Sequence, residues 1–301
     1  MRILTLGLLV ASALLAPGMA AQQRLEPPNP LEPKQGNPYI REGDAHYGRR
    51  EEKRAGPVAD RGEIAAAARA YETASEAADS AEARWKLARA LIFQGSYTAI
   101  EAAARQAVYE KARRVSEDGI RIVERRAKRG GAKDFDLLSA LDIAATSRKD
   151  ADASPVFYWA AVSWGQWALA RGKEEATKLG AAQKIRDYAT ILIELDPGFE
   201  DGGGYRVLGR LHDQAPRMQG ETEWVSREEA IRNLRLAIKT DATNFANRLY
   251  LAEALARGTA AERAEAVRLA QGLVSDAPSP TRLVEELRIQ ADAAADLASW
   301  K

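Results

Sequence analysis

The sequence predicts an all-α fold built from stacked helix pairs. From Glu63 onward, apolar residues recur at helical spacing, with Ile64, Ala68 and Tyr71 on one face of the first predicted helix. No segment alternates polar and apolar residues for long enough to indicate a strand. A short pattern of small and large residues also returns four times along the chain, which is typical of a helical repeat.

The repeated pattern resembles the tetratricopeptide repeat, which has W-x2-L-G-x2-Y on its first helix and A-x3-F on its second. Tyr205-x2-Leu208-Gly209-x2-His212, followed by Ala230-x3-Leu234, fits this template. The other copies have their first and second helices near residues 84–91 and 116–129, 158–165 and 185–189, and 248–255 and 266–270. We predict a tetratricopeptide-like solenoid or bundle of about four degenerate helix pairs plus extra helices. A generic helical bundle with small-residue contacts is the alternative.

The first 62 residues differ from this helical domain. Residues 1–21 combine a positive start, a short apolar run and small residues at Ala20 and Ala21, which predicts a cleaved secretory signal peptide. The alternative, a membrane anchor, needs a longer apolar run. Residues 22–62 contain five prolines between positions 27 and 38 and a charged stretch, so we predict a disordered tail with His46 and Tyr47 in a solvated linker. The helical domain is then expected over residues 63–301.

Composition restricts the classes of function. Lys and Arg total 44 against 43 Asp and Glu, so the sequence carries no basic excess of the kind that nucleic-acid binding requires. There is no Cys, which excludes disulfides and Cys-type zinc sites, and the 2 His lie in no metal-binding spacing. No lipid-anchoring Cys follows the signal. We therefore expect an exported, periplasmic protein with no cofactor and no metal.

Motifs that would indicate catalysis are incomplete. Gly204 and Gly209 have the spacing of a phosphate-binding loop, but Arg210 and Leu211 stand where Lys and Ser or Thr are needed. The glycines at 202–204 are instead expected to form a turn between repeats. No local Ser motif of the G-x-S-x-G type is present, so we predict that the protein is not an enzyme. An enzyme using the acidic residues around Asp201 is the weakest alternative.

Aromatic residues are unusually dense on the helix expected over residues 154–171. Tyr158, Trp159, Trp164 and Trp167 are too many large rings for one narrow core seam, so we expect some of them to line a cavity or an oligomer interface. The alternative is that all of them fill the core.

Several segments resemble the T component of tripartite ATP-independent periplasmic (TRAP) transporters, the TatT family. The segment at 154–165, SPVFYWAAVSWG, resembles that family's LYW-x-A-x3-WG stretch. The segment at 202–211, followed by Ala215-Pro216, is similar to its GG-x2-R-x-LG and AP stretches, and NRLYLAE at 247–253 is similar to its N-x2-YLAE helix.

This resemblance implies an accessory protein of solute uptake that acts by protein–protein interaction. It implies a homo-oligomer that associates with a periplasmic solute-binding protein, with an apolar small molecule as the ligand that is passed on. The expected ligand- or partner-binding residues are Tyr158, Trp159, Trp164, Trp167, Tyr205, Arg206 and Tyr250. A general envelope scaffold that grips peptides, with no link to transport, is the alternative function.

Overall fold

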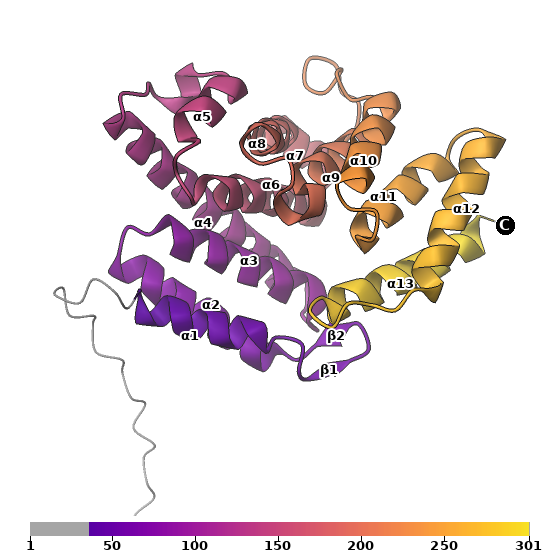
Figure 1. Cartoon of the computed structure of the whole chain (residues 1–301), viewed down its shortest axis with the longest axis horizontal. Coiled ribbons are helices and arrows are strands. Elements are labelled where there is room, and N and C mark those ends of the chain that lie inside the picture. Colours follow the sequence, from indigo (N-terminus) through magenta and orange to yellow (C-terminus); the bar gives the residue numbers. More distant parts are fainter. Residues whose placement is uncertain (1–35, 301) are drawn as a thin grey trace, which may run out of the picture. The chain divides into compact units, whose positions relative to one another are not determined.

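The computed structural model describes residues 36–300, which form thirteen α-helices (Figure 1). The all-α prediction is confirmed. The helices are α1 (Pro38–Gly48), α2 (Arg61–Ala77), α3 (Ala81–Tyr97), α4 (Ala102–Arg129), α5 (Ala140–Ser147), α6 (Ala153–Arg171), α7 (Lys173–Lys178), α8 (Ala181–Leu195), α9 (Phe199–Gln214), α10 (Arg227–Thr240), α11 (Phe245–Ala256), α12 (Ala260–Ser275) and α13 (Leu283–Ser299). The remaining elements are a 3-10 turn (Phe135–Leu137) and a hairpin of β1 (Arg54–Ala55) and β2 (Val58–Ala59).

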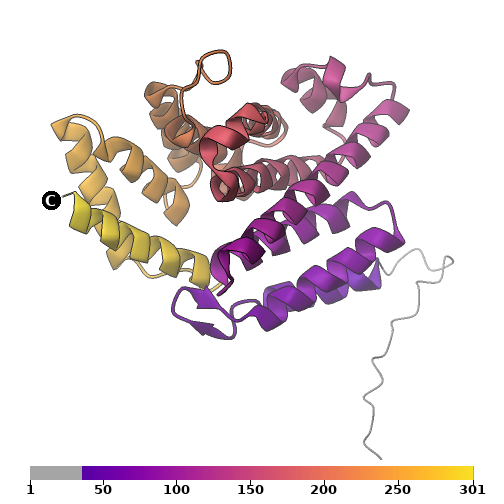
Figure 2. The ribbon, with the colours of Figure 1, turned by 180° about the vertical axis from the view of Figure 1, so that it is seen from behind.

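Helices that follow one another along the chain pack against each other. The closest partnerships include α3 with α4, α6 with α8, α9 with α10, and α11 with α12 (Figures 1 and 2). These are the four pairs that the repeated sequence pattern predicts. A fifth pair, α1 with α2, precedes them, while α4 with α6 and α8 with α9 join one pair to the next. Since each pair buries its apolar face on its neighbours, the array forms its core in series.

Local sequence determines where several helices begin. Ser80, Ser139 and Ser226 each accept a hydrogen bond from a backbone N–H of the first turn. Thr259 and Glu262 form a reciprocal capping box at the start of α12. These caps satisfy N–H groups that have no partner within the helix, so each of these helices begins at a defined residue.

Small side chains allow the paired helices to approach closely. In the pair α9–α10, Ala230 and Leu234 are fully buried, and a Cβ added to Gly209 would lie 2.6 Å from Leu234 Cγ and 3.1 Å from the Ala230 carbonyl oxygen. In the next pair, Ala252 is likewise fully buried. The small residues of the repeated pattern therefore face the helix interfaces and not the solvent.

The prediction of a disordered tail over residues 22–62 is wrong for the part of it that the structure describes. Pro38 lies in the first turn of α1, where its missing N–H costs nothing, and the Asn37 side chain accepts from the next N–H at 2.9 Å. Asp44 then accepts hydrogen bonds from the Tyr71 hydroxyl and Lys86 Nζ, both at 2.7 Å. The prolines at positions 27–33 and the predicted signal peptide lie outside the described residues.

Two other local predictions need correction. His46 belongs to α1 and its Nδ1 lies 2.8 Å from Glu63 Oε2, so it is not in a solvated linker. The helix expected to start at Ser154 begins one residue earlier, with Asp152 as its N-cap. The last helix begins at Leu283, because residues 279–282 form a turn in which the Arg282 N–H donates to the Ser279 carbonyl at 3.2 Å. None of the helices within residues 36–300 combines the length and apolar composition needed to cross a bilayer.

We expect Gly209→Ala to lower the free energy of unfolding by roughly 1–2 kcal/mol, because the new methyl group clashes with Leu234 and the backbone of α10. Gly165→Ala is the matched control, since it also lies inside a helix but its Cβ would meet no atom within 4 Å. The control should gain up to about 1 kcal/mol from helix propensity. Urea unfolding followed by circular dichroism measures both, and equal behaviour of the two variants would contradict the close approach of α9 and α10.

Candidate functional site

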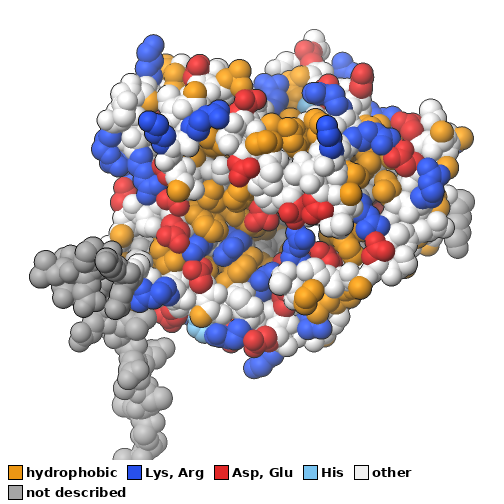
Figure 3. Space-filling view, viewed as in Figure 1, with side chains coloured by type: hydrophobic (Ala, Val, Ile, Leu, Met, Phe, Trp, Pro, Cys, Tyr) orange, Lys and Arg blue, Asp and Glu red, His pale blue; other side chains and the backbone are white. Residues whose placement is uncertain are grey.

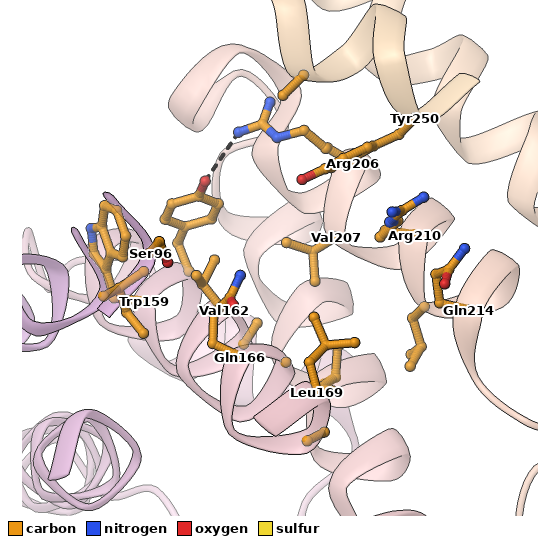
Figure 4. A pocket seen from close by; sticks show the side chains of 18 of the residues that line it. Ser96, Trp159, Val162, Gln166, Leu169, Arg206, Val207, Arg210, Gln214 and Tyr250 are labelled. Carbon is orange, nitrogen blue, oxygen red and sulfur yellow. Dashed lines mark hydrogen bonds between the residues drawn. The ribbon is translucent and has the colours of Figure 1, made fainter. Parts of the chain in front are cut away.

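A cavity of about 400 Å³ opens between helices from both ends of the described chain. Residues of α1, α3, α6, α9, α11 and α13 contribute to its lining, and Figure 3 shows the hollow near the centre of one face, with hydrophobic and basic side chains visible inside it. In Figure 4, Val162 of α6 and Val207 of α9 project toward the same space. The apolar and aromatic lining consists chiefly of Tyr47, Ile92, Phe93, Tyr97, Tyr158, Trp159, Ala161, Val162, Leu169, Val207, Leu211, Phe245, Tyr250 and Ile289.

The structure separates the residues that sequence reasoning grouped into one site. Tyr158, Trp159, Arg206 and Tyr250 line the cavity. The other three expected binding residues, Trp164, Trp167 and Tyr205, are not part of its lining.

Trp164 and Trp167 lie on the side of α6 that packs against α4. Their rings are 5.4 Å apart in an edge-to-face arrangement, and the Arg113 guanidinium lies 4.7 and 5.0 Å from their centroids. Trp164 Nε1 donates to Glu117 Oε1 at 2.5 Å, and the Tyr188 hydroxyl of α8 donates to the same oxygen at 2.8 Å. These two tryptophans therefore hold α6 on α4 and belong to the core. For these two rings, the structure agrees with the alternative interpretation, in which the aromatic residues fill the core.

Arg206 joins three helices above the cavity. Its guanidinium donates to Asn247 Oδ1 at 2.9 Å, to the Tyr158 hydroxyl at 3.0 Å and to the Glu200 carbonyl at 3.0 Å (Figure 4). The side chain is only 8% exposed, and burial raises the pKa of Tyr158, so its hydroxyl stays a neutral acceptor. All three acceptors are uncharged, and together they fix α6, α9 and α11 at one point. We infer that Arg206 stabilises the cavity wall by holding these three helices together, and we call this interaction the Arg206 brace.

The start of α9 carries unusual backbone geometry. Glu200 (φ 49°) and Asp201 (φ 59°) are left-handed, followed by Gly202 (φ 81°), so a kink over residues 200–202 lies inside the first turn of α9. The turn expected at residues 202–204 is wrong for Gly203 and Gly204, which are helical and pack against α6 and α8. Left-handed backbone costs a non-glycine residue about 1–3 kcal/mol and persists only when surrounding contacts hold it. Here Asp201 Oδ2 accepts from Arg282, the N-cap residue of α13, at 2.6 Å and from Asn244, the N-cap residue of α11, at 3.0 Å.

The same kink exposes backbone to α11. Asn247 Nδ2 donates to the Asp201 carbonyl at 2.9 Å. Burial would raise the pKa of Asp201, but the hydrogen bonds from Arg282 and Asn244 lower it overall. The Asp201 carboxylate therefore stays ionised at neutral pH and fastens α9 to both α11 and α13. A Cβ on Gly203 would lie 2.6 Å from the Tyr158 ring, so glycine is required for this close approach of α9 to α6.

Three cations of the wall, Arg210, Arg282 and Lys173, already contact neighbouring side chains. Arg210 pairs with Glu253 and stacks at 4.4 Å on the Tyr250 ring. Arg282 pairs with Asp201, and Lys173 Nζ donates to Gln214 at 2.7 Å. Because these cations already have partners in the wall, the free surface inside the cavity is mainly apolar and aromatic.

Sequence reasoning missed the contribution of the chain ends to the site. Tyr47, Phe93 and Tyr97 line the cavity from α1 and α3, and Phe93 and Tyr97 lie 5.2 Å apart. Glu285 lines it from α13. The polar composition around Tyr47 predicts a disordered tail, and an acidic pair such as that at 285–286 is typical of a solvated helix surface. Phe93 and Tyr97 are four residues apart on a predicted helix, and this spacing could have indicated that their rings lie together on one face.

We expect Arg206→Met to lower the free energy of unfolding by roughly 3 kcal/mol, because Tyr158, Asn247 and the Glu200 carbonyl lose their donor at a buried position. Arg232→Met is the control: Arg232 is exposed and pairs with Glu229 on its own helix, so its loss should change stability by less than about 0.5 kcal/mol. Chemical unfolding of both variants is the measurement. A cost for Arg206→Met no greater than that of the control would contradict the brace.

Comparison with known proteins agrees with this architecture. The family model described as TRAP transporter T-component matches residues 88–291, which is more than half of the chain. The matched span runs from α3 to α13 and includes the four helix pairs from the second half of α3 onward, together with the kink at the start of α9. No curated protein sequence matches the chain. The chain belongs to the TRAP transporter T-component family.

Proposed function

We propose that this protein is a non-enzymatic, periplasmic accessory component of TRAP-type solute uptake that binds the solute-binding protein of the system and holds an apolar ligand in its cavity. Family membership supports the link to transport. The proposal of a bound ligand rests on the cavity of about 400 Å³, a volume within the range of small-molecule sites. Arg210 and Arg282 of its wall already pair with Glu253 and Asp201, which favours an apolar occupant.

The lining supports a ligand that is apolar over most of its length. Ile92, Val162, Leu169 and Val207 offer aliphatic surface, and the aromatic rings around them offer flat contact surface. Removing such surface from water contributes about 25 cal/mol for each Å² that is buried. We infer that binding depends on shape and burial more than on hydrogen bonds.

The remaining parts of the proposal concern location and assembly. The signal pattern at residues 1–21 supports export to the periplasm, where a solute-binding protein would be met. We also propose that the chain forms a homo-oligomer, in line with its resemblance to the TatT family. A general peptide-binding scaffold is less well supported, because repeat architecture alone does not account for the family match.

Filling the cavity should abolish ligand binding. N-phenyl-1-naphthylamine, a neutral apolar fluorophore, is a suitable probe, and we expect it to bind the native protein with increased fluorescence. Val162→Trp places an indole between α6 and α9 and should weaken binding at least tenfold, about 1.4 kcal/mol. Val274→Trp is the control, because Val274 lies on α12, is 45% exposed and is not part of the lining. Unchanged probe affinity in Val162→Trp would show that the cavity is not the binding site.

The partner is tested by mixing the purified protein with the purified solute-binding protein of the same organism's TRAP system. We expect a complex in size-exclusion chromatography with light scattering, which also reports the oligomeric state of the chain alone. A solute-binding protein from an unrelated uptake system should elute separately. Equal association with both proteins, or with neither, would contradict the proposed partnership.

A further inference from the structure

The two ends of the described chain meet at the cavity. The start of α13 lies beside the segment that follows α1, as the ribbon shows from both sides (Figures 1 and 2). Glu51 Oε2 accepts from the Val284 N–H at 3.1 Å, and Arg50 Nη2 donates to the Thr281 carbonyl at 3.0 Å. These contacts join residues that are more than 230 positions apart.

One guanidinium in this junction serves two carboxylates. Arg50 Nη2 lies 2.6 Å from Glu51 Oε1 and 3.1 Å from Glu285 Oε1. The side chains of Arg50 and Glu51 are each 11% exposed, and that of Glu285 is 20% exposed. Glu285 Oε2 is buried and accepts no hydrogen bond from the described residues. When both carboxylates are ionised, the junction therefore holds two negative charges against one positive charge, in a site that water reaches poorly.

The groups around Glu285 do not cancel this excess. Arg89 is held against the Tyr47 ring at 3.8 Å and makes no ion pair with either carboxylate among residues 36–300. Arg282 pairs with Asp201 and Glu286. Of the charged and titratable groups near Glu285, Arg50, Glu51, Tyr47 and Tyr97 interact with it electrostatically. Four more share the cavity lining with it: Arg89, Glu200, Arg282 and Glu286.

We propose that Arg50, Glu51 and Glu285 form a proton-operated clasp between the chain ends, which keeps one wall of the cavity closed while Glu285 is protonated and releases α13 when Glu285 is ionised. Tyr47, Glu285 and Ile289 line the cavity from the two sides of this junction, so its release opens the cavity. As a means of regulating ligand release, the clasp rests on the proposed function. The clasp itself does not require a ligand.

The direction of the pH effect follows from the environment of Glu285. Burial raises its pKa to about 7, with Arg50 opposing and Glu51 adding to the shift. A carboxyl group whose pKa is higher in the closed state than in water favours closure when protonated. That contribution is complete below the ordinary pKa of Glu and is lost as the pH rises through about 7. The clasp is therefore closed in acid and opens on the alkaline side of neutrality.

Distance measurement between spin labels tests the clasp. The chain has no Cys, so labels on Glu52→Cys and Ala291→Cys, both at exposed positions on the two sides of the junction, are specific. In the ligand-free full chain we expect one short distance at pH 5.5. At pH 8.5 we expect a second population that is longer by roughly one helical turn, about 5 Å.

Two variants and one control make the result specific. Glu285→Gln keeps the shape of the protonated side chain and should stay closed at both pH values. Glu51→Gln retains an acceptor for Val284 but leaves a balanced Arg50–Glu285 pair, so it should also stay closed at pH 8.5. Asp292→Asn, an exposed carboxylate on the same helix, should open like the native protein. Circular dichroism confirms that each variant is folded.

The outcomes separate the clasp from the proposed function. A native distance that does not change with pH, or a Glu285→Gln variant that still opens, would overturn the clasp even if N-phenyl-1-naphthylamine binds. If the distances behave as expected but the probe binds at neither pH, the clasp stands and the apolar-ligand function fails. If both hold, the dissociation rate of the probe should rise between pH 5.5 and 8.5 in the native protein and not in Glu285→Gln.

Discussion

The close approach of helix backbones is the constraint on which this structure depends. At three interfaces a tyrosine ring lies on a glycine of the facing helix: Tyr71 on Gly43, Tyr109 on Gly95 and Tyr158 on Gly203. An added Cβ would lie 2.4–2.6 Å from the ring in each case, so any larger residue would push the helices apart. The cavity lies between helices that this packing holds in place, with lining residues from α3, α6, α9 and α13.

Much of the fold could be predicted because it depends on short-range patterns. Helical periodicity and the spacing of Gly209, Ala230 and Leu234 follow from neighbours within one or two helices. The cavity could not be assembled this way, because Tyr47 and Glu285 reach it through contacts between distant parts of the chain. The N-terminal segment was misjudged for a related reason. Its composition is polar, and α1 is ordered by tertiary hydrogen bonds of Asp44 to Tyr71 and Lys86.

The aromatic cluster on α6 shows the limit of inference from composition within a helix. Tyr158 and Trp159 face the cavity, while Trp164 and Trp167 face α4. Sequence spacing places these rings at different angles around the helix axis, but it does not tell which angle points to a neighbour and which to a hollow. Arg206, also expected to contact a ligand or partner, lines the cavity and makes three hydrogen bonds within its wall.

Contact between α13 and the segment after α1 also changes how such an array can unfold. In an open repeat array, each unit touches only its neighbours, and terminal units fray independently of the middle. Here Arg50 and Glu51 tie the last helix to the first, so neither end is free to fray without disturbing the other. While this junction is closed, on the acid side of neutrality, the described chain should therefore melt as one cooperative unit, and its terminal helices should exchange their amide hydrogens as slowly as those in the centre.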